Sequence, residues 1–223
     1  TRPDYISPNI IDAVEWILSG HSDLSRRLAP IAVEATRSIR LVLIGGLARA
    51  GKSYAAQVLK ELLNALEYQA HVISLDGWLK PKSERMEGLG VCERYDLASA
   101  SAAISSALCS KSRFVLSEKL YDRSGRNVDS QSINHSIGPN DVIILEGVPA
   151  LLMEDLISLP KVMTVYIDIT SDLRGVRLKQ DYAWRDMSAE QQLGILNSRN
   201  FDEVPIVEKS RIVADFIIEA PQE

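Results

Sequence analysis

The feature that most constrains this chain of 223 residues is the segment GLARAGKS, which covers residues 46–53. It matches the pattern G-x-x-x-x-G-K-[ST], in which glycines let several backbone N–H groups converge on phosphate oxygens. An apolar run precedes it at 41–44, and an amphipathic helical pattern follows over 53–68. A strand, a glycine-rich loop and a helix N-terminus form the context in which this pattern binds a nucleotide. The alternative is a plain strand-to-helix turn with a surface lysine.

Each position of this loop has a predicted role. Lys52 is expected to bridge the β- and γ-phosphates of ATP, and the hydroxyl of Ser53 is expected to bind Mg²⁺. Arg49 is bulky for its position, so it either points to solvent or adds positive charge near the phosphates. The residues expected to contact the nucleotide are Gly46, Ala48, Arg49, Ala50, Gly51, Lys52, Ser53 and Tyr54.

Beyond residue 40, short apolar runs alternate with helical patterns. Strands are expected at 41–44, 71–75, 142–145, 162–169 and 216–219, with a weaker one at 113–117. Helices are expected at 53–68, 96–110 and 173–185, and a long loop or hairpin at 123–140. Strands that alternate with helices imply βαβ units. With the phosphate loop, this predicts an α/β fold of the three-layer P-loop NTPase type, with a mostly parallel sheet.

Residues 1–40 are predicted to form a helical extension before a main domain that covers 41–223. Apolar residues recur at helical spacing over 10–18, and Gly20 is expected to end that helix. A second helix is expected from Asp23 toward Ser38, bent or divided by Pro30. Nothing catalytic is found here, so the extension is expected to pack on the main domain or to offer a partner surface.

Acidic residues lie at or just after the ends of three predicted strands, at the sheet edge where open α/β folds bind ligands. Asp76 is the candidate general base or acceptor-orienting group, and an Asx turn is its structural alternative. Glu146 is expected to bind magnesium or its waters, with a turn or capping role as the competitor. Asp168 is interpreted as a cap of the following turn.

Arginines and aromatic residues supply the other candidates. Arg174, Arg177 and Arg185 fall on related turns of the predicted helix 173–185, which is either a solvated face or a lid over the γ-phosphate. Aromatic residues in the connections around Asp76 are expected to enclose a small acceptor, although Trp78 fits the core equally well. These substrate-side candidates are Trp78, Tyr95 and Tyr121.

Composition argues against several classes of protein. The net charge is −5, so no general basic field favours nucleic acid or an anionic membrane. Cys92 and Cys109 lack a CxxC spacing, which favours two reduced thiols over a disulfide or a zinc site. No run has membrane-spanning length and no signal-peptide core is visible, so a cytoplasmic location is expected. The oligomeric state stays undecided, with a homodimer open.

Several segments resemble, in their order, the P-loop kinases of the uridine kinase, phosphoribulokinase and bacterial pantothenate kinase group. They are GLARAGKS, VISLDGWLKPK, GVCERYD, KLYDRSGR, VIILEGVPALL and RLKQDYAWRD, and the similarity spans about residues 40–219. The resemblance implies an ATP- and Mg²⁺-dependent kinase that transfers the γ-phosphoryl group to a hydroxyl of a small molecule. It places Asp76 at the catalytic aspartate, Lys52 and Ser53 at the ATP and magnesium residues, and Glu146 at a nearby active-site acid. Tyr121 falls on a substrate-contacting tyrosine, and Arg177 and Arg185 fall on lid arginines.

Departures from the uridine kinase pattern leave the acceptor open. Residues 89–92 read LGVC where uridine kinases hold ribose hydroxyls with an acid, and Gln180 replaces a lid arginine. The acceptor is therefore expected to be a nucleoside-, pantothenate- or sugar-like metabolite. The alternative function is a nucleotide-binding switch or pseudo-kinase that acts on a protein partner. A GTPase switch is disfavoured because no guanine-reading NKxD motif occurs.

Overall fold

The computed structural model describes residues 10–85, 89–122, 127–185 and 187–220, and its centre is a five-stranded sheet. The strand order is β2-β5-β1-β6-β7, and every neighbouring pair is parallel. The strands are β1 (Leu41–Gly45), β2 (Ala70–Ser74), β5 (Val142–Glu146), β6 (Val162–Asp168) and β7 (Phe216–Glu219). The predicted α/β fold with its mostly parallel sheet is confirmed.

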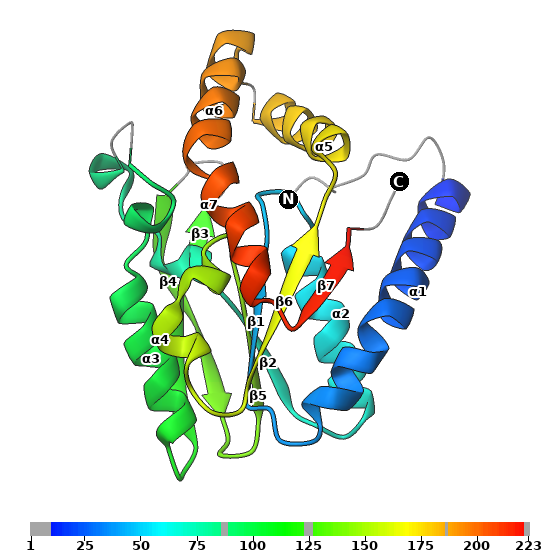
Figure 1. Cartoon of the computed structure of the whole chain (residues 1–223), viewed down its shortest axis with the longest axis vertical. Helices are drawn as coiled ribbons and strands as arrows, with labels where there is room; N and C mark the ends of the chain where they lie inside the picture. Colours follow the sequence, from blue (N-terminus) through cyan, green and yellow to red (C-terminus); the bar gives the residue numbers. More distant parts are fainter. Residues whose placement is uncertain (1–9, 86–88, 123–126, 186, 221–223) are drawn as a thin grey trace.

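Helices cover both faces of this sheet and make three layers (Figure 1). On one face lie α1 (Ile10–Ala35) and α2 (Lys52–Ala65); on the other lie α3 (Leu97–Cys109), α4 (Glu154–Ile157) and α7 (Val204–Lys209). In β1, Leu41 and Leu43 face the second set of helices, whereas Val42 and Ile44 face the first. Because both faces are covered, the central strands are largely apolar, and this is why the sequence alone predicts them.

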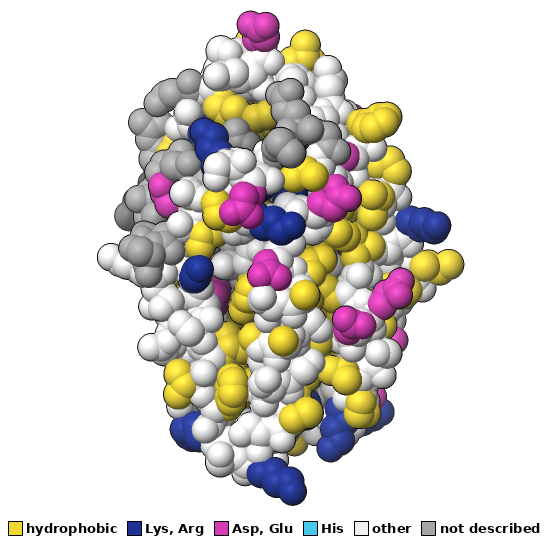
Figure 2. Space-filling model, turned by 90° about the vertical axis from the view of Figure 1, so that its left-hand side faces the viewer, with side chains coloured by type: hydrophobic (Ala, Val, Ile, Leu, Met, Phe, Trp, Pro, Cys, Tyr) yellow, Lys and Arg dark blue, Asp and Glu magenta, His cyan; other side chains and the backbone are white. Residues whose placement is uncertain are grey.

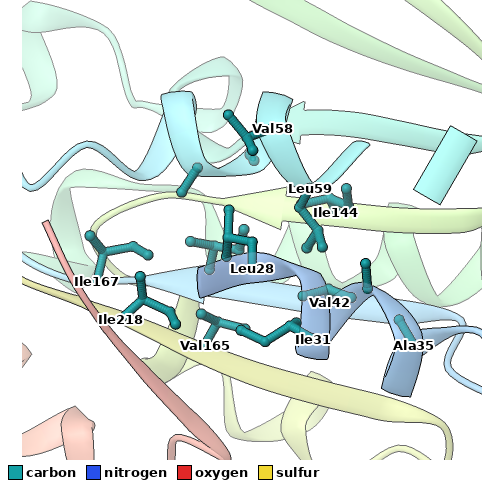
Figure 3. Close-up of a cluster of buried hydrophobic side chains, with 14 of the residues drawn as sticks. Leu28, Ile31, Ala35, Val42, Val58, Leu59, Ile144, Val165, Ile167 and Ile218 are labelled. Atoms are coloured by element: carbon teal, nitrogen blue, oxygen red, sulfur yellow. The ribbon is translucent and has the colours of Figure 1, made fainter. Parts of the chain in front are cut away.

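The N-terminal segment differs from the prediction of two helices separated at Gly20. It is one helix, α1, that runs through both Gly20 and Pro30. Its second half buries Leu28, Ile31 and Ala35 against α2 and the sheet, as Figure 3 shows. Burial of several such side chains, at about 1.5–3 kcal/mol for each large one, offsets the roughly 1 kcal/mol cost of a helical glycine and the roughly 3 kcal/mol cost of a helical proline.

A two-stranded antiparallel hairpin accompanies the main sheet. It consists of β3 (Phe114–Asp122) and β4 (Asn127–Ile137): the strand expected at 113–117 is the first half of a longer β3, and β4 falls within 123–140, where a loop or a hairpin was expected. The hairpin packs against the turn after β2, where a Cβ at Gly77 would lie 2.7 Å from the carbonyl oxygen of Lys119. Gly77 therefore allows the close approach of β3.

The segment between β6 and β7 passes over the carboxyl edge of the sheet (Figure 1). It contains α5 (Ser171–Trp184), α6 (Ala189–Asp202) and α7, of which only α5 was predicted. The capping box of Ser188 and Gln191 begins α6. In the part of the chain that the structure describes, no helix is both long and apolar enough to cross a membrane. On the side of the molecule where α3 lies, acidic and basic side chains are interspersed (Figure 2).

Candidate active site

The phosphate loop joins β1 to α2, and two glycines with positive φ shape it. Gly46 has φ 136°, and a Cβ there would lie 2.4 Å from the carbonyl oxygen of Ile167 in β6. Gly51 has φ 96° and is the N-terminal cap of α2. The first N–H groups of a helix have no carbonyl partner within that helix, so those of α2 are donors that could bind an anion.

Replacing Gly46 by Ala is expected to destabilise the fold by about 2–4 kcal/mol, because the new Cβ overlaps backbone and φ is strained. The matched control is Gly20→Ala, at a helical glycine whose Cβ position has nothing within 4 Å. This control should raise stability by up to about 1 kcal/mol. Denaturant unfolding of both variants measures the two effects, and equal stabilities would contradict the described loop geometry.

Lys52 is the cation of the site. Its side chain is buried, and its Nζ donates to the carbonyl oxygen of Leu47 at 2.8 Å. Burial lowers the pKa of Lys52, while Glu146, Glu203 and Asp76 oppose that shift. Lys52 thus lies among three carboxylates, and its own loop holds the ammonium group where a phosphate chain would pass.

Ser53 and Glu146 face each other beside Lys52. The Ser53 hydroxyl donates to Glu146 Oε1 at 3.0 Å. Burial raises the pKa of Glu146, Lys52 lowers it, and Asp76 raises it further. A cation is therefore favourable here, and a hydroxyl with one carboxylate suits Mg²⁺, which keeps several waters and phosphate oxygens as its other ligands. No group of three His, Cys, Asp or Glu residues forms a closed metal cage among the described residues.

Asp76 lies one strand away from Glu146, in a short 3-10 helix, Leu75–Trp78, that follows β2. The hydroxyl of Ser74 accepts the N–H of Asp76 at 3.3 Å, so a serine makes the local turn contact that the Asx alternative ascribed to Asp76. The Asp76 carboxylate instead accepts the hydroxyl of Tyr95 at 3.4 Å. Burial, followed by the charge of Asp76, raises the pKa of Tyr95 well above its usual range.

Sheet register explains why these residues meet. Ser74 of β2, Glu146 of β5 and Ile44 of β1 are level with one another across three neighbouring strands. The strands end together, so Asp76, Glu146 and the phosphate loop emerge side by side at the carboxyl edge. The structure thus brings together the predicted set of Asp76, Glu146, Lys52 and Ser53.

The other substrate-side candidates are less central. Tyr95 joins the site through Asp76, as described above. Trp78 is half-buried and packs on the hydrophobic cluster beneath α3, in agreement with the alternative that it belongs to the core. Tyr121 lies near the end of β3, opposite Val128. A role for Trp78 or Tyr121 in binding an acceptor stays a prediction.

The predicted lid arginines lie on α5, which contacts the loop. Arg177 donates to the carbonyl oxygen of Arg49 at 3.4 Å. Asp181 forms ion pairs with both Arg49 and Arg185, the latter at 2.9 Å. Arg49 therefore does not simply point to solvent, because it ties the loop to α5. Tyr54, on the other side of the loop, places its hydroxyl 3.3 Å from His21 Nδ1 of α1.

Three charged residues of the site were not predicted as a group. Glu203, between α6 and α7, accepts the N–H of Ala48 at 3.0 Å, and it pairs with Arg174 at 3.3 Å and Arg199 at 3.4 Å. Burial alone would raise the pKa of Glu203, but Arg199, the Ala48 N–H and Arg174 together lower it. The i, i+4 spacing of Arg199 and Glu203 was visible in the sequence, but it commonly marks an exposed helical pair.

A pocket of about 500 Å³ opens at the carboxyl ends of β6 and β7. Its lining residues are Asp168, Ile169, Thr170, Asp172, Leu173, Glu219 and Ala220. The sequence interpretation of Asp168 as a cap is wrong, because Thr170 caps α5 by accepting the N–H of Leu173. Asp168 forms an ion pair with Arg211 at 3.1 Å instead.

Comparison with known proteins identifies the fold. No protein-family model matches the chain, and no curated protein does. Among solved structures, a candidate fructose transport system kinase from Silicibacter sp. is 18% identical, with a TM-score of 0.65 over 87% of this chain and 98% of that one. A D-glycerate 3-kinase from Cryptococcus neoformans is 14% identical, with a TM-score of 0.63 over 90% and 97%. A candidate uridine kinase from Bacillus stearothermophilus is 17% identical, with a TM-score of 0.52 over 88% and 99%. The chain therefore has the fold of the uridine kinase-like P-loop kinases.

Proposed function

We propose that this protein is an ATP- and Mg²⁺-dependent kinase that phosphorylates a hydroxyl group of a small nucleoside-, pantothenate- or sugar-like metabolite. One observation carries the proposal: Asp76 lies at the same sheet edge as Lys52, Ser53 and Glu146. A nucleotide-binding loop alone requires no second carboxylate on the neighbouring strand. A kinase does, because the acceptor hydroxyl needs a group that orients it and receives its proton. The names of the similar structures agree with this class of reaction.

The roles of the chain's own residues follow from their positions. Lys52 and the loop N–H groups would hold the β- and γ-phosphates, after Lys52 leaves the carbonyl oxygen of Leu47. Ser53 and Glu146 would hold Mg²⁺, which supplies charge neutralisation on the phosphate oxygens. Asp76 would accept the proton of the acceptor hydroxyl, with Tyr95 orienting the carboxylate. The pocket beside β6 and β7 has room for the base of the nucleotide.

The function is tested by incubating the full chain with Mg²⁺-ATP and a panel of nucleosides, pantothenate-like compounds, sugars and hydroxy acids. ADP formation that depends on one class of acceptor is the expected result. ADP formation with no acceptor dependence, or none at all, would remove the kinase assignment.

Glu146→Gln is expected to raise the Mg²⁺ concentration for half-maximal activity by roughly tenfold, because an amide oxygen is a weaker ligand for a hard cation than a carboxylate. The control is Glu154→Gln, which alters an exposed acid of α4. Activity titrated against Mg²⁺ at saturating ATP measures the shift. An unchanged midpoint would mean that Glu146 has only a structural role.

A second candidate function is a nucleotide-binding regulatory switch or pseudo-kinase that acts on a protein partner. The observation in its favour is that the Glu203 carboxylate engages the Ala48 N–H, a donor of the phosphate loop. Calorimetry separates the two candidates. A kinase couples nucleotide binding to a small acceptor, whereas a switch couples it to a protein.

A further inference from the structure

The groups that surround the Glu203 carboxylate are of the kind that bind a phosphate anion. Its carboxylate receives a loop N–H from Ala48 and the guanidinium groups of Arg174 on α5 and Arg199 on α6. Only 2% of Glu203 and 6% of Arg174 are exposed to solvent. Backbone N–H groups together with arginines are also the donors that hold phosphoryl oxygens. The charge of Glu203 is thus held by the same kind of donors that a nucleotide would require.

Glu203 also lies close to the other parts of the loop. It is one of the carboxylates that act on the buried ammonium group of Lys52. A phosphoryl group bound by Lys52 and the loop would meet the Glu203 carboxylate at short range, and two anions at such a separation repel strongly in a partly buried site. Both anions cannot keep the same donor at Ala48.

The place of Glu203 in the chain allows it to withdraw. It is the residue that joins α6 to α7, and Pro205 lies in the first turn of α7. The preceding residue, Asp202, pairs with Arg94 in the segment that leads to Tyr95, and its Oδ1 is buried without a hydrogen-bond partner among the described residues. A movement of Glu203 and Asp202 would therefore be transmitted through Arg94 to the segment of Tyr95, on the acceptor side of the site.

We propose, resting on the proposed function, that Glu203 is an internal substitute for the terminal phosphoryl group of ATP. Its carboxylate accepts the Ala48 N–H and pairs with Arg174 and Arg199. The γ-phosphoryl group of bound ATP displaces the carboxylate and takes over both arginines. Arg174 and Arg199 are thus the phosphoryl-binding arginines contributed by the segment over the loop, and the exchange distinguishes ATP from ADP, which lacks the displacing group.

The test compares the affinities of ADP and of a β,γ-imido analogue of ATP, both with Mg²⁺, for three forms of the full chain. Glu203→Gln removes the competing charge and keeps a hydrogen-bond acceptor, so the analogue should bind roughly tenfold more tightly while the affinity for ADP changes less than about twofold. Glu208→Gln, an exposed acid of α7, is the matched control and should leave both affinities as in the wild type.

Arg199→Gln keeps Glu203 and provides a second measurement that does not depend on the folding of Glu203→Gln. It should weaken binding of the analogue by roughly tenfold and leave ADP binding within about twofold. The contradicting result is a wild type that binds both nucleotides, with neither variant changing the ratio of the affinities for the ATP analogue and for ADP. In that case the proposed displacement of Glu203 is wrong, and the kinase proposal stands. If the wild type binds neither nucleotide, the kinase proposal fails and the exchange fails with it.

Discussion

Phosphoryl transfer by the Asp76→Asn variant is expected to be about 10²- to 10⁴-fold slower in kcat than transfer by the wild type, because an amide cannot accept the proton of the acceptor hydroxyl. The substitution is close to isosteric, and the side-chain oxygen can still accept the hydroxyl of Tyr95, which now donates at 3.4 Å. Folding should therefore be preserved. Affinity for the nucleotide should stay similar or increase slightly, because one carboxylate near Lys52 has been neutralised.

The measurement is steady-state transfer with the acceptor found in the panel, at saturating Mg²⁺-ATP, together with a binding isotherm for the ATP analogue. Asp155→Asn, at an exposed acid of α4, is the control for a general effect of removing a negative charge. A variant with wild-type kcat would remove Asp76 from the reaction and leave the turn after β2 as its only role.

Lys52→Met should lower kcat by at least about 10²- to 10³-fold, the usual loss when one preorganised donor to the transferred group is removed. Its effect on ATP affinity should also be large, because Lys52 lies among the carboxylates of Glu146, Glu203 and Asp76. Without the ammonium group, those carboxylates repel the phosphates. Met retains most of the length of the side chain, so the loss is one of charge more than of packing.

Binding of the ATP analogue and transfer activity are measured for Lys52→Met beside Lys111→Met, which removes an exposed lysine after α3. The control should behave as the wild type. If Lys52→Met binds and turns over ATP normally, residues 46–53 do not form a nucleotide site, and the function proposed for the chain is wrong.

The central strands and the phosphate loop were predictable from local patterns. Strands β1, β5 and β6 are buried on both faces, so each is largely apolar, with Thr164 as a polar residue inside β6, and shows little helical periodicity. The helix predicted after Asp96 is α3, and the Asp96 side chain caps it by accepting the N–H of Ser99 at 3.1 Å. These signals are local because an apolar run and a cap are each formed by neighbouring residues of the same segment.

The N-terminal helix was misjudged for a reason that lies outside its own segment. Gly20 and Pro30 are helix-breaking residues by intrinsic preference. They remain inside α1 because Leu28, Ile31 and Ala35 find a partner surface on α2 and the sheet. The free energy gained by burying these side chains cannot be inferred from residues 10–35 alone.

The charged groups around Glu203 also could not be predicted from local sequence, because they come from remote segments. Ala48 lies more than a hundred positions before Arg174 and Glu203 in the chain, yet the three residues share one hydrogen-bonded cluster. Only the docking of α5 and the α6–α7 junction over the carboxyl edge brings them together (Figure 1). In the sequence, Arg174 and Glu203 each look like an ordinary helical surface charge.

The sequence by itself determined that a phosphate loop lies between a buried strand and a helix, that Asp76 follows one strand of a parallel sheet, and that Glu146 ends another. Those properties follow from residue type and short-range spacing. The strand order, which places β5 between β2 and β1, was decided only by the tertiary structure, and so was the approach of Glu203 to the loop. Both depend on which apolar faces and which opposite charges pack best across the whole chain. The loop therefore indicates a bound nucleotide, and its tertiary neighbours, Asp76 on one side and Glu203 with its arginines on the other, point to the chemistry proposed for it.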